Sequence, residues 1–254
     1  MSHSVASKVP DTLQPPFALL TPRLLLLPTP LAIDCSAYLD MYARLHSSSD
    51  FCITAFGSDF AIQNWDIAER TAIVQREILS SWAVRGMGDF AIGLLPDTLR
   101  PKSSDPSSNS TYTMRTVEAS LQDPWLDDIQ WIGYVGVRDA TTTSIPKFNP
   151  TFHANMMQTG QYPPWQNMIE LRYGLDQCAW GRGFGTEAAQ AIVDWCKGEK
   201  GGRRFIAESE KLNEGSKKIL RKLGFVECEL QYWGMTGTIE WEYPISATSS
   251  IISV

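Results

Sequence analysis

The chain has 254 residues, 43% of them hydrophobic, which is enough for the packed core of a single enlarged domain. Its formal net charge of −6 at pH 7 excludes a generally basic surface, so we expect no nucleic-acid partner. It contains no run of about 18 apolar residues and no signal pattern at its start, so we expect a cytoplasmic protein with no membrane partner.

The N-terminal half of the chain alternates predicted strands and helices. We expect a flexible tail over residues 1–18, a strand over 20–26 and a short helix over 33–45. Apolar side chains at helical spacing then predict the buried stripe of a longer helix, which Gly86 and Gly88 end. This stripe consists of Trp65, Ala68, Ala72, Val74, Ile78, Leu79 and Trp82. Residues 89–95 predict the next strand, which Pro96 ends.

Two long insertions are predicted in the middle of the chain, over about residues 97–130 and 140–167, with a strand over 131–137 between them. The first insertion is rich in Ser, Pro, Asp and Asn. The second holds four prolines and the aromatic residues Phe148, Phe152, Tyr162 and Trp165. We expect both to be irregular, because long loops of this composition are typically binding loops or disordered decoration.

The C-terminal part of the chain predicts a strand over 168–175, a loop over 176–179 and a helix that ends near Gly198. The buried face of that helix is expected to consist of Ala188, Ala189, Ile192, Val193 and Cys196. A strand over 204–207 and a hairpin of 225–232 with 236–243 around Gly234 follow, and residues 246–254 form a predicted tail.

Three glycines, Gly181, Gly183 and Gly185, lie between this predicted strand and helix. The first N–H groups of a helix lack intrahelical partners and the helix dipole places about half a positive charge there, which favours a bound phosphate. Many turns of this kind bind nothing, so an anion site and a plain turn both remain open. The spacings GxGxxG of a dinucleotide fold and GxxxxGK of a P-loop are absent.

Three runs of residues carry a family resemblance: Trp180-Gly181-Arg182-Gly183-Phe184-Gly185-Thr186-Glu187-Ala188, Asn213-Glu214-Gly215-Ser216 ahead of Lys222-Leu223-Gly224-Phe225, and Leu20-Thr21-Pro22-Arg23-Leu24. The first resembles the acetyl-CoA loop of the GNAT superfamily of N-acetyltransferases, (Gln/Arg)-x-x-Gly-x-(Gly/Ala), with Trp180 in place of Gln or Arg. All three are similar to the branch typified by the ribosomal-protein N-terminal acetyltransferases. The resemblance leaves residues 97–130 without a counterpart.

The resemblance implies a single α/β GNAT domain over residues 19–245, with a mixed, mostly antiparallel central sheet flanked by helices and the two insertions. It implies transfer of an acetyl group from acetyl-CoA to a primary amine, by direct attack in a ternary complex. A small-molecule amine is slightly favoured over a protein N-terminus, because the aromatic residues of the second insertion could roof a closed pocket. An inactive sensor or scaffold protein that binds acyl-CoA is the alternative.

The resemblance also implies where acetyl-CoA binds as the acyl-donor substrate. The pyrophosphate is expected on the backbone of Gly181, Arg182, Gly183, Phe184, Gly185 and Thr186. The preceding strand is expected to splay from its neighbour and to present its edge near Leu175 to the pantetheine arm, which Asn213 also binds. For Arg182, contact with a phosphate and plain exposure to solvent both remain open. The wide spacing of the five cysteines and three histidines predicts no metal site.

A primary ammonium group must lose a proton before it attacks a thioester, because only the neutral amine is a nucleophile. Glu170 is the expected base, and a structural ion pair with Arg172 on the same strand face remains equally open. The resemblance implies Ser216 as the acid that protonates the CoA sulfur, with Tyr173 as a second candidate. Helix capping by Asn213 and Ser216, and core packing by Tyr173, remain open as structural interpretations.

Overall fold

A computed structural model describes residues 10–96, 110–117, 126 and 128–243 of the chain. These residues form one nine-stranded sheet with the strand order β4-β1-β2-β3-β5-β6-β7-β9-β8. The strands are β1 (Phe17–Leu20), β2 (Leu24–Pro28), β3 (Asp89–Leu94), β4 (Thr113–Thr116), β5 (Trp131–Asp139), β6 (Ile169–Leu175), β7 (Phe205–Glu210), β8 (Val226–Glu227) and β9 (Thr238–Tyr243). Among the described strands, β6 and β7 alone pair in parallel, so the prediction of a mixed, mostly antiparallel sheet is confirmed.

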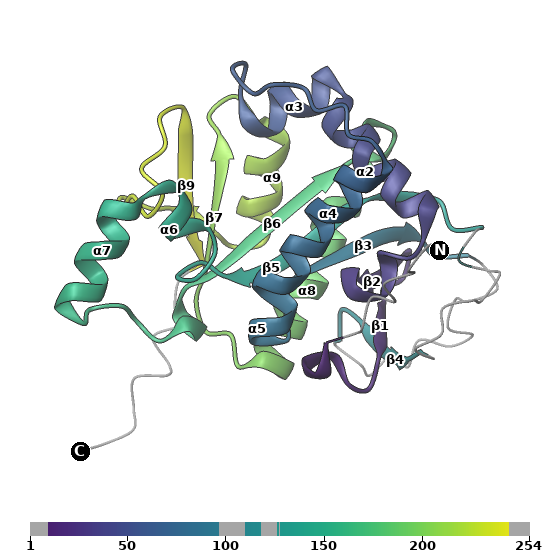
Figure 1. Ribbon diagram of the computed structural model, residues 1–254, viewed down its shortest axis with the longest axis horizontal. Coiled ribbons are helices and arrows are strands. Elements are labelled where there is room, and N and C mark those ends of the chain that lie inside the picture. The colour runs from purple at the N-terminus through teal and green to yellow at the C-terminus, as the bar shows by residue number, and fades with distance from the viewer. Residues whose placement is uncertain (1–9, 97–109, 118–125, 127, 244–254) are drawn as a thin grey trace, which may run out of the picture.

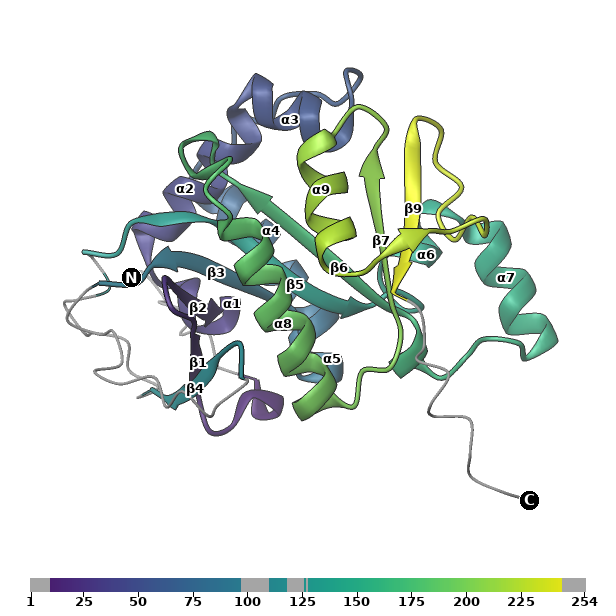
Figure 2. The same ribbon diagram turned by 180° about the vertical axis from the view of Figure 1, so that it is seen from behind.

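Helices cover both faces of this sheet. The helices α8 (Phe184–Lys200) and α9 (Glu214–Lys222) lie on one face, as Figure 2 shows. The other face, toward the viewer in Figure 1, carries most of the remaining helices. The remaining helices are α1 (Thr29–Ala32), α2 (Ser36–Ser47), α3 (Ser49–Phe56), α4 (Ile67–Glu77), α5 (Ala83–Arg85), α6 (Ser144–Phe148) and α7 (Pro150–Thr159), of which α7 projects beyond the β9 side of the sheet. Within the described ranges, no helix combines the length and the apolar character that crossing a membrane requires.

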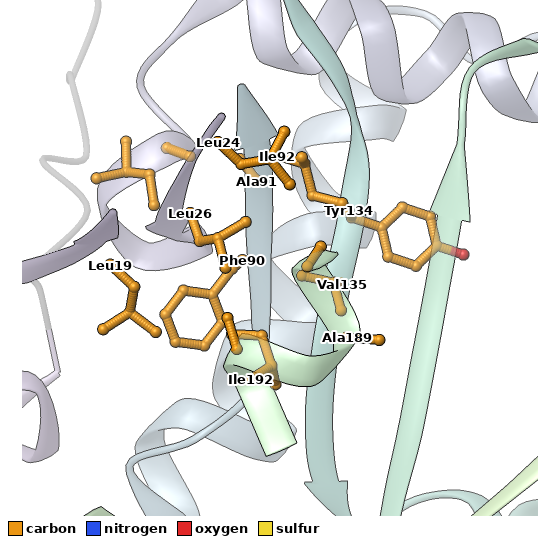
Figure 3. Packing of buried hydrophobic residues seen from close by; sticks show 14 of the residues in the cluster. Leu19, Leu24, Leu26, Phe90, Ala91, Ile92, Tyr134, Val135, Ala189 and Ile192 are labelled. Atoms are coloured by element: carbon orange, nitrogen blue, oxygen red, sulfur yellow. The ribbon is translucent and has the colours of Figure 1, made fainter. Parts of the chain in front are cut away.

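The main core lies between α8 and the strands beneath it. In Figure 3, Ala189 and Ile192 of α8 lie beside Phe90 of β3 and Val135 of β5, and all four side chains are fully buried. The five residues predicted for the buried face of this helix are indeed buried. The helix runs two residues further than predicted, to Lys200, and Gly201 ends it with a φ of +67°.

The N-terminal segment differs from the prediction in two ways. Residues 10–18 are part of the fold, because Leu13 is buried and Phe17 begins β1, so the predicted tail was wrong there; residues 1–9 lie outside the described chain. The predicted strand over 20–26 is in fact a hairpin of β1 and β2. At its turn, the Thr21 hydroxyl accepts a hydrogen bond from the Leu24 N–H at 3.0 Å. Pro22 lacks an N–H group and suits this turn.

Three residues of the predicted stripe of the long helix, Ala68, Ala72 and Leu79, are exposed. The helix begins at Ile67 with a capping box formed by Asp66 and Glu69, and it continues from Glu77 into a π-helical turn, Ile78–Trp82. Ile78 and Trp82 are buried as predicted, whereas Leu79 is 60% exposed. A π turn inserts one extra residue per turn, so a stripe counted at 3.6 residues shifts at this position.

The second insertion is regular, which contradicts the prediction of an irregular loop. Asn149 caps α7, since its side-chain oxygen accepts the Phe152 N–H at 3.1 Å, and Pro150 occupies the first helical position. Phe152 stacks edge-on against Tyr232, with 6.0 Å between ring centroids. Phe152 therefore packs α7 against the loop between β8 and β9.

The remaining segments differ in smaller ways. The described part of the first insertion adds β4 to the edge of the sheet beside β1 and buries Ile129; most of the predicted loop lies outside the described residues. The predicted strand over 225–232 is reduced to the two residues of β8. Glu240 explains this, because its carboxylate accepts the backbone N–H groups of Tyr232, Trp233 and Gly234 and holds that segment as a loop. The predicted tail over 246–254 lies outside the described chain.

Candidate active site

The parallel strands β6 and β7 separate soon after they begin. Their register pairs are Ile169 with Phe205 and Glu170 with Ile206, and the pairing ends there. By contrast, β6 pairs with β5 along its whole length, up to Leu175 opposite Gly133. In Figure 2, the two strands diverge and α9 lies over the space between them. The splay predicted for the strand before the glycine loop is thus present.

The exposed edge of β6 presents backbone groups to this space, which we call the strand gap. The Asp176 N–H donates to the Ile132 carbonyl oxygen at 2.8 Å, which fixes the alternation of the antiparallel ladder. Tyr173 and Leu175 therefore direct their backbone groups away from β5, into the strand gap. The Leu175 carbonyl oxygen accepts the indole N–H of Trp180 at 2.8 Å. Trp180, which replaces the Gln or Arg of the family pattern, thus ties the glycine loop to the strand end.

Two of the three glycines adopt left-handed backbone conformations. Gly181 has a φ of +71° and Gly183, the N-cap of α8, has a φ of +81°. A Cβ atom on Gly181 would meet nothing within 4 Å, and one on Gly183 would meet only Arg23, 3.4 Å from its Nη2 atom. The loop is therefore an open surface. The N–H groups of Phe184, Gly185 and Thr186 precede the first helical bond, from Glu187 to Gly183, and can bind an anion.

Gly185 has a different reason to be glycine. It is buried, and a Cβ atom there would lie 2.7 Å from Cδ1 of Ile219, so α8 and α9 pack closely at this point. The prediction treated all three glycines as a means of close approach to phosphate. For Gly185, close packing of the two helices is a sufficient explanation.

A clamp of three residues joins the N-terminal hairpin to the start of α8. Glu187 accepts hydrogen bonds from the Thr21 hydroxyl at 2.6 Å and from the Arg23 backbone N–H at 3.0 Å. The Arg23 guanidinium pairs with the same carboxylate at 2.6 Å and donates to the Arg182 carbonyl oxygen at 3.0 Å. The sequence analysis listed these residues as parts of two motifs but did not predict that they contact each other. The occurrence of both motifs, Thr-Pro-Arg-Leu and Thr-Glu-Ala, in one chain could have indicated this contact.

Positive charge flanks the glycine loop on both sides. The guanidinium groups of Arg23 and Arg182 lie 4.6 Å and 4.7 Å from the centroid of the buried Phe184 ring. Arg182 itself is exposed. Because Glu187 already pairs with Arg23, the exposed Arg182 is the main cation beside the open backbone N–H groups, and a guanidinium with such donors matches the charge and geometry of a phosphate. The donor set of this loop therefore fits the phosphate end of a coenzyme A molecule.

The start of α9 brings Asn213, Ser216 and Tyr173 together at the strand gap. Asn213 caps α9 by accepting the Ser216 N–H at 2.9 Å and donates to the Thr54 carbonyl oxygen in α3, also at 2.9 Å. The Tyr173 hydroxyl donates to the Ser216 carbonyl oxygen at 3.3 Å. Burial raises the pKa of Tyr173 well above 10, and the bond to Ser216 offsets this only in part. The capping interpretation of Asn213 is thus correct, and Tyr173 stays a proton donor.

Glu170 is paired with Arg138 on the neighbouring strand, not with Arg172 as predicted. Nε and Nη2 of Arg138 each donate to one carboxylate oxygen at 2.9 Å, and the Ser144 hydroxyl also donates to Glu170. The side chain is buried. Burial alone would raise the pKa of Glu170, but the Arg138 guanidinium outweighs it and the pKa is lowered. These are the contacts of a structural ion pair.

Arg172 has other partners. Its Nη1 atom donates to Glu77 of α4 at 3.0 Å, and its Nε atom lies 3.7 Å from Asp89. The prediction placed Arg172 beside Glu170 because residues two apart on a strand share a face. The cross-strand neighbour at the same register, Arg138 opposite Glu170, is closer. Among the residues that the structure describes, no group of three or more His, Cys, Asp or Glu side chains could hold a metal ion.

The comparisons with known proteins agree on one family. A family model described as an acetyltransferase (GNAT) domain matches residues 50–226. The uncharacterized N-acetyltransferase YjdG of Bacillus subtilis is 32% identical over 75 residues, which make up 28% of this chain and 45% of that protein. The aligned stretch thus spans less than half of this curated relative.

Solved structures share the fold at low sequence identity. An acetyltransferase from Agrobacterium tumefaciens has a TM-score of 0.53 and 18% identity, covering 89% of this chain and 94% of its own. A putative GNAT-family acetyltransferase from Bordetella pertussis has a TM-score of 0.52 and 16% identity, covering 89% and 99%. AAC(6′)-Ib in complex with ribostamycin and coenzyme A has a TM-score of 0.52 and 11% identity, covering 94% and 98%. At these identities, the likeness concerns the fold.

Proposed function

Since this chain belongs to the GNAT acetyltransferase family, we propose that it transfers the acetyl group of acetyl-CoA to a primary amine, within a ternary complex. The observation that supports this most directly is the strand gap, whose edge leads into an open glycine loop at a helix N-terminus. A pantetheine arm needs an unpaired strand edge, and a pyrophosphate needs converging N–H groups. Both are present along one continuous path.

In this proposal, each end of the donor substrate has its own residues. The pyrophosphate binds the backbone N–H groups from Gly181 to Thr186, with the guanidinium groups of Arg23 and Arg182 beside it. The pantetheine arm pairs with the backbone of Tyr173 and Leu175. Asn213 lies at the same edge and keeps one side-chain N–H for the arm, because the other is donated to Thr54.

The proposed acid for the departing thiolate is the pair of hydroxyl groups at the start of α9. The Tyr173 hydroxyl reaches the backbone carbonyl oxygen of Ser216 at the start of that helix. The raised pKa of Tyr173 keeps it protonated at neutral pH but also makes it a weaker acid than an ordinary tyrosine. A backbone N–H at the strand edge, such as that of Leu175, would stabilise the oxyanion of the tetrahedral intermediate. Positioning of the two substrates supplies the rest of the rate.

The proposed acceptor is a small-molecule amine, because α3 spans the wide end of the strand gap. At one end of the helix, Cζ of Phe51 would lie 2.9 Å from a Cβ atom on Gly174 of β6. About one turn further along, the Thr54 carbonyl oxygen accepts a hydrogen bond from Asn213, which follows β7. A helix in this position closes the groove that a protein N-terminus would need.

The test is thermal-shift stabilisation by acetyl-CoA, followed in the same samples by thiol release over a panel of small primary amines and short peptides. We expect stabilisation of the wild type, since a ligand at 100 times its Kd adds about 2.7 kcal/mol. Gly183→Trp should abolish it. Gly160→Trp is the matched control, because Gly160 also has a positive φ, +64°, and open space, but lies at the end of α7.

Three outcomes of this test are informative. Stabilisation with thiol release for a small amine supports the proposal. Release only with peptides would move the acceptor to a protein N-terminus. Stabilisation without release for any acceptor would replace the enzyme by a protein that senses or scaffolds acyl-CoA.

A further inference from the structure

Glu208 lies where β7 leaves β6. It is two residues beyond Ile206, the last residue of β7 that pairs with β6, and it would face Arg172 if the pairing continued. Side chains alternate along a strand, so Glu208 shares the face of Ile206, which packs with Ile145 of α6 and Tyr232. Glu208 is exposed at this opening. Its carboxylate therefore lies at the entrance to the strand gap, on the face opposite α8 and α9.

The carboxylate of Glu208 lacks the partners that its acidic neighbours have. Glu170 is paired with Arg138, and Glu240 accepts three backbone N–H groups. Within the described residues, no hydrogen bond or ion pair engages the Glu208 carboxylate. An acidic side chain without a paired cation or donor, beside a substrate path, is free to accept a proton.

The surroundings of Glu208 also raise its affinity for a proton. Although Glu208 is exposed at the opening, the surrounding strands restrict its hydration, and this is the largest cause of the shift. The negative charges of Glu170 on β6, Glu240 on β9 and Glu210 on β7 add to it, and Arg138 on β5 opposes it. Together they raise the pKa of Glu208 from 4.5 to about 7. A general base works best when its pKa lies near the working pH.

We propose that Glu208 is the general base that deprotonates the acceptor ammonium, a role that rests on the acetyl transfer proposed above. The ammonium gives one proton to the Glu208 carboxylate, and the neutral nitrogen attacks the thioester carbonyl carbon. A C–N bond forms and the C–S bond breaks. The second nitrogen proton replaces the one that Ser216 or Tyr173 gives to the thiolate. The products are the acetamide and the free thiol, and Glu208 returns its proton to solvent.

The proposed base and the proposed acid lie on opposite sides of the strand gap. Tyr173 reaches α9, because its hydroxyl bonds to Ser216, so the proposed acid lies on the α9 side. Glu208 lies on the other side, together with Arg172, which pairs with Glu77 of α4, and with Glu170, whose partner Arg138 also pairs with Glu77. The acceptor can thus enter from the face that carries Glu208, while the sulfur is protonated from the face that carries α9.

The experiment compares kcat/KM against pH for the wild type, Glu208→Gln and Glu208→Asp. We expect a wild-type profile that rises with pH to a plateau above about pH 7, because the base must be deprotonated. In Glu208→Gln, kcat/KM should no longer rise with pH up to about pH 7, and its value on the plateau should be at least about 100-fold lower than that of the wild type. Glu208→Asp keeps a carboxylate and should recover part of the rate.

Glu210→Gln is the matched control, since it removes the same charge from the same strand face, beside Gly57. In this variant kcat/KM should still rise with pH, with the midpoint shifted slightly to lower pH. The role of Glu208 is overturned if Glu208→Gln retains the wild-type plateau and limb, or if Glu210→Gln loses as much activity.

A stability measurement separates this inference from the proposed function. Because the folded-state pKa of Glu208 is raised, the charged form costs stability as pH rises from 4.5 through about 7. Glu208→Gln should therefore have a higher Tm than the wild type at pH 8 but not at pH 5. Thermal shift with acetyl-CoA should be the same for both proteins. Loss of that shift in the wild type would instead contradict the proposed function.

Discussion

Glu170 and Glu208 lie on neighbouring strands, yet their surroundings change their proton affinities in opposite directions. The Arg138 guanidinium lowers the pKa of Glu170, whereas dehydration and three other carboxylates raise that of Glu208. Burial is unfavourable to both charges, so the difference comes from the partner. The sequence shows only that each is a glutamate on a predicted strand or at its end. The cross-strand neighbour decides its chemistry.

Glu170→Gln should reduce stability and leave the pH profile of catalysis unchanged. Removing Glu170 from this buried ion pair leaves the Arg138 charge with only Glu77 as a partner, at 3.2 Å, and we expect a loss of about 3 kcal/mol in the free energy of unfolding. The folded-state pKa is lowered, so the stabilisation is present above pH 4.5 and is lost as pH falls below it. Urea unfolding at pH 7 and pH 3.5 measures this. If Glu170→Gln kept its stability but its kcat/KM no longer rose with pH, Glu170 would be the general base after all.

Among the larger elements, the clamp between the β1–β2 hairpin and α8 determines how firmly the glycine loop is held. Arg23→Ala removes a guanidinium beside the loop and its bonds to Glu187 and Arg182. We expect the KM for acetyl-CoA to rise about tenfold, or about 1.4 kcal/mol, with kcat nearly unchanged. Arg221→Ala, which breaks an exposed pair with Glu227, is the control. Equal KM values for the two variants would show that the clamp does not support binding.

The elements around the site were predictable where one periodic pattern decided the structure. The face of α8, the position of β6 and the glycine turn follow from spacing alone. The prediction failed where local capping competed with composition. Pro150 and Asn149 begin a helix in a segment that its four prolines suggested was irregular. It also failed where pairing is non-local, as for the Arg138 partner of Glu170, which depends on the β5–β6 register.

Across the whole molecule, the pH dependence of stability should have a second component, from His46. This side chain is buried among Tyr42, Trp65 and Phe56, and its Nδ1 atom lies 2.9 Å from the Tyr42 carbonyl oxygen. Burial lowers the pKa of His46 from 6.5 to about 4. The unfolded chain therefore takes up a proton that the folded chain does not, and stability falls as pH decreases through that window.

We expect His46 to account for about 3 kcal/mol of lost stability between pH 7 and pH 4. His46→Asn keeps a donor for the Tyr42 carbonyl oxygen but does not titrate. Its free energy of unfolding, measured in urea, should be lower at pH 7 and nearly flat down to pH 4.5. A variant whose stability declines as steeply as that of the wild type would assign the acid sensitivity to other groups.

The Thr21–Arg23–Glu187 clamp also has a consequence for the order in which the chain assembles. Its partners are 164 to 166 residues apart in the sequence. Contacts at such separation require closure of a very long loop and form slowly compared with local structure. During synthesis, the hairpin leaves the ribosome long before Glu187 exists. We expect nascent chains that end before α8 to have paired strands but no phosphate-binding site. Affinity for coenzyme A would therefore appear only when the last third of the chain has folded.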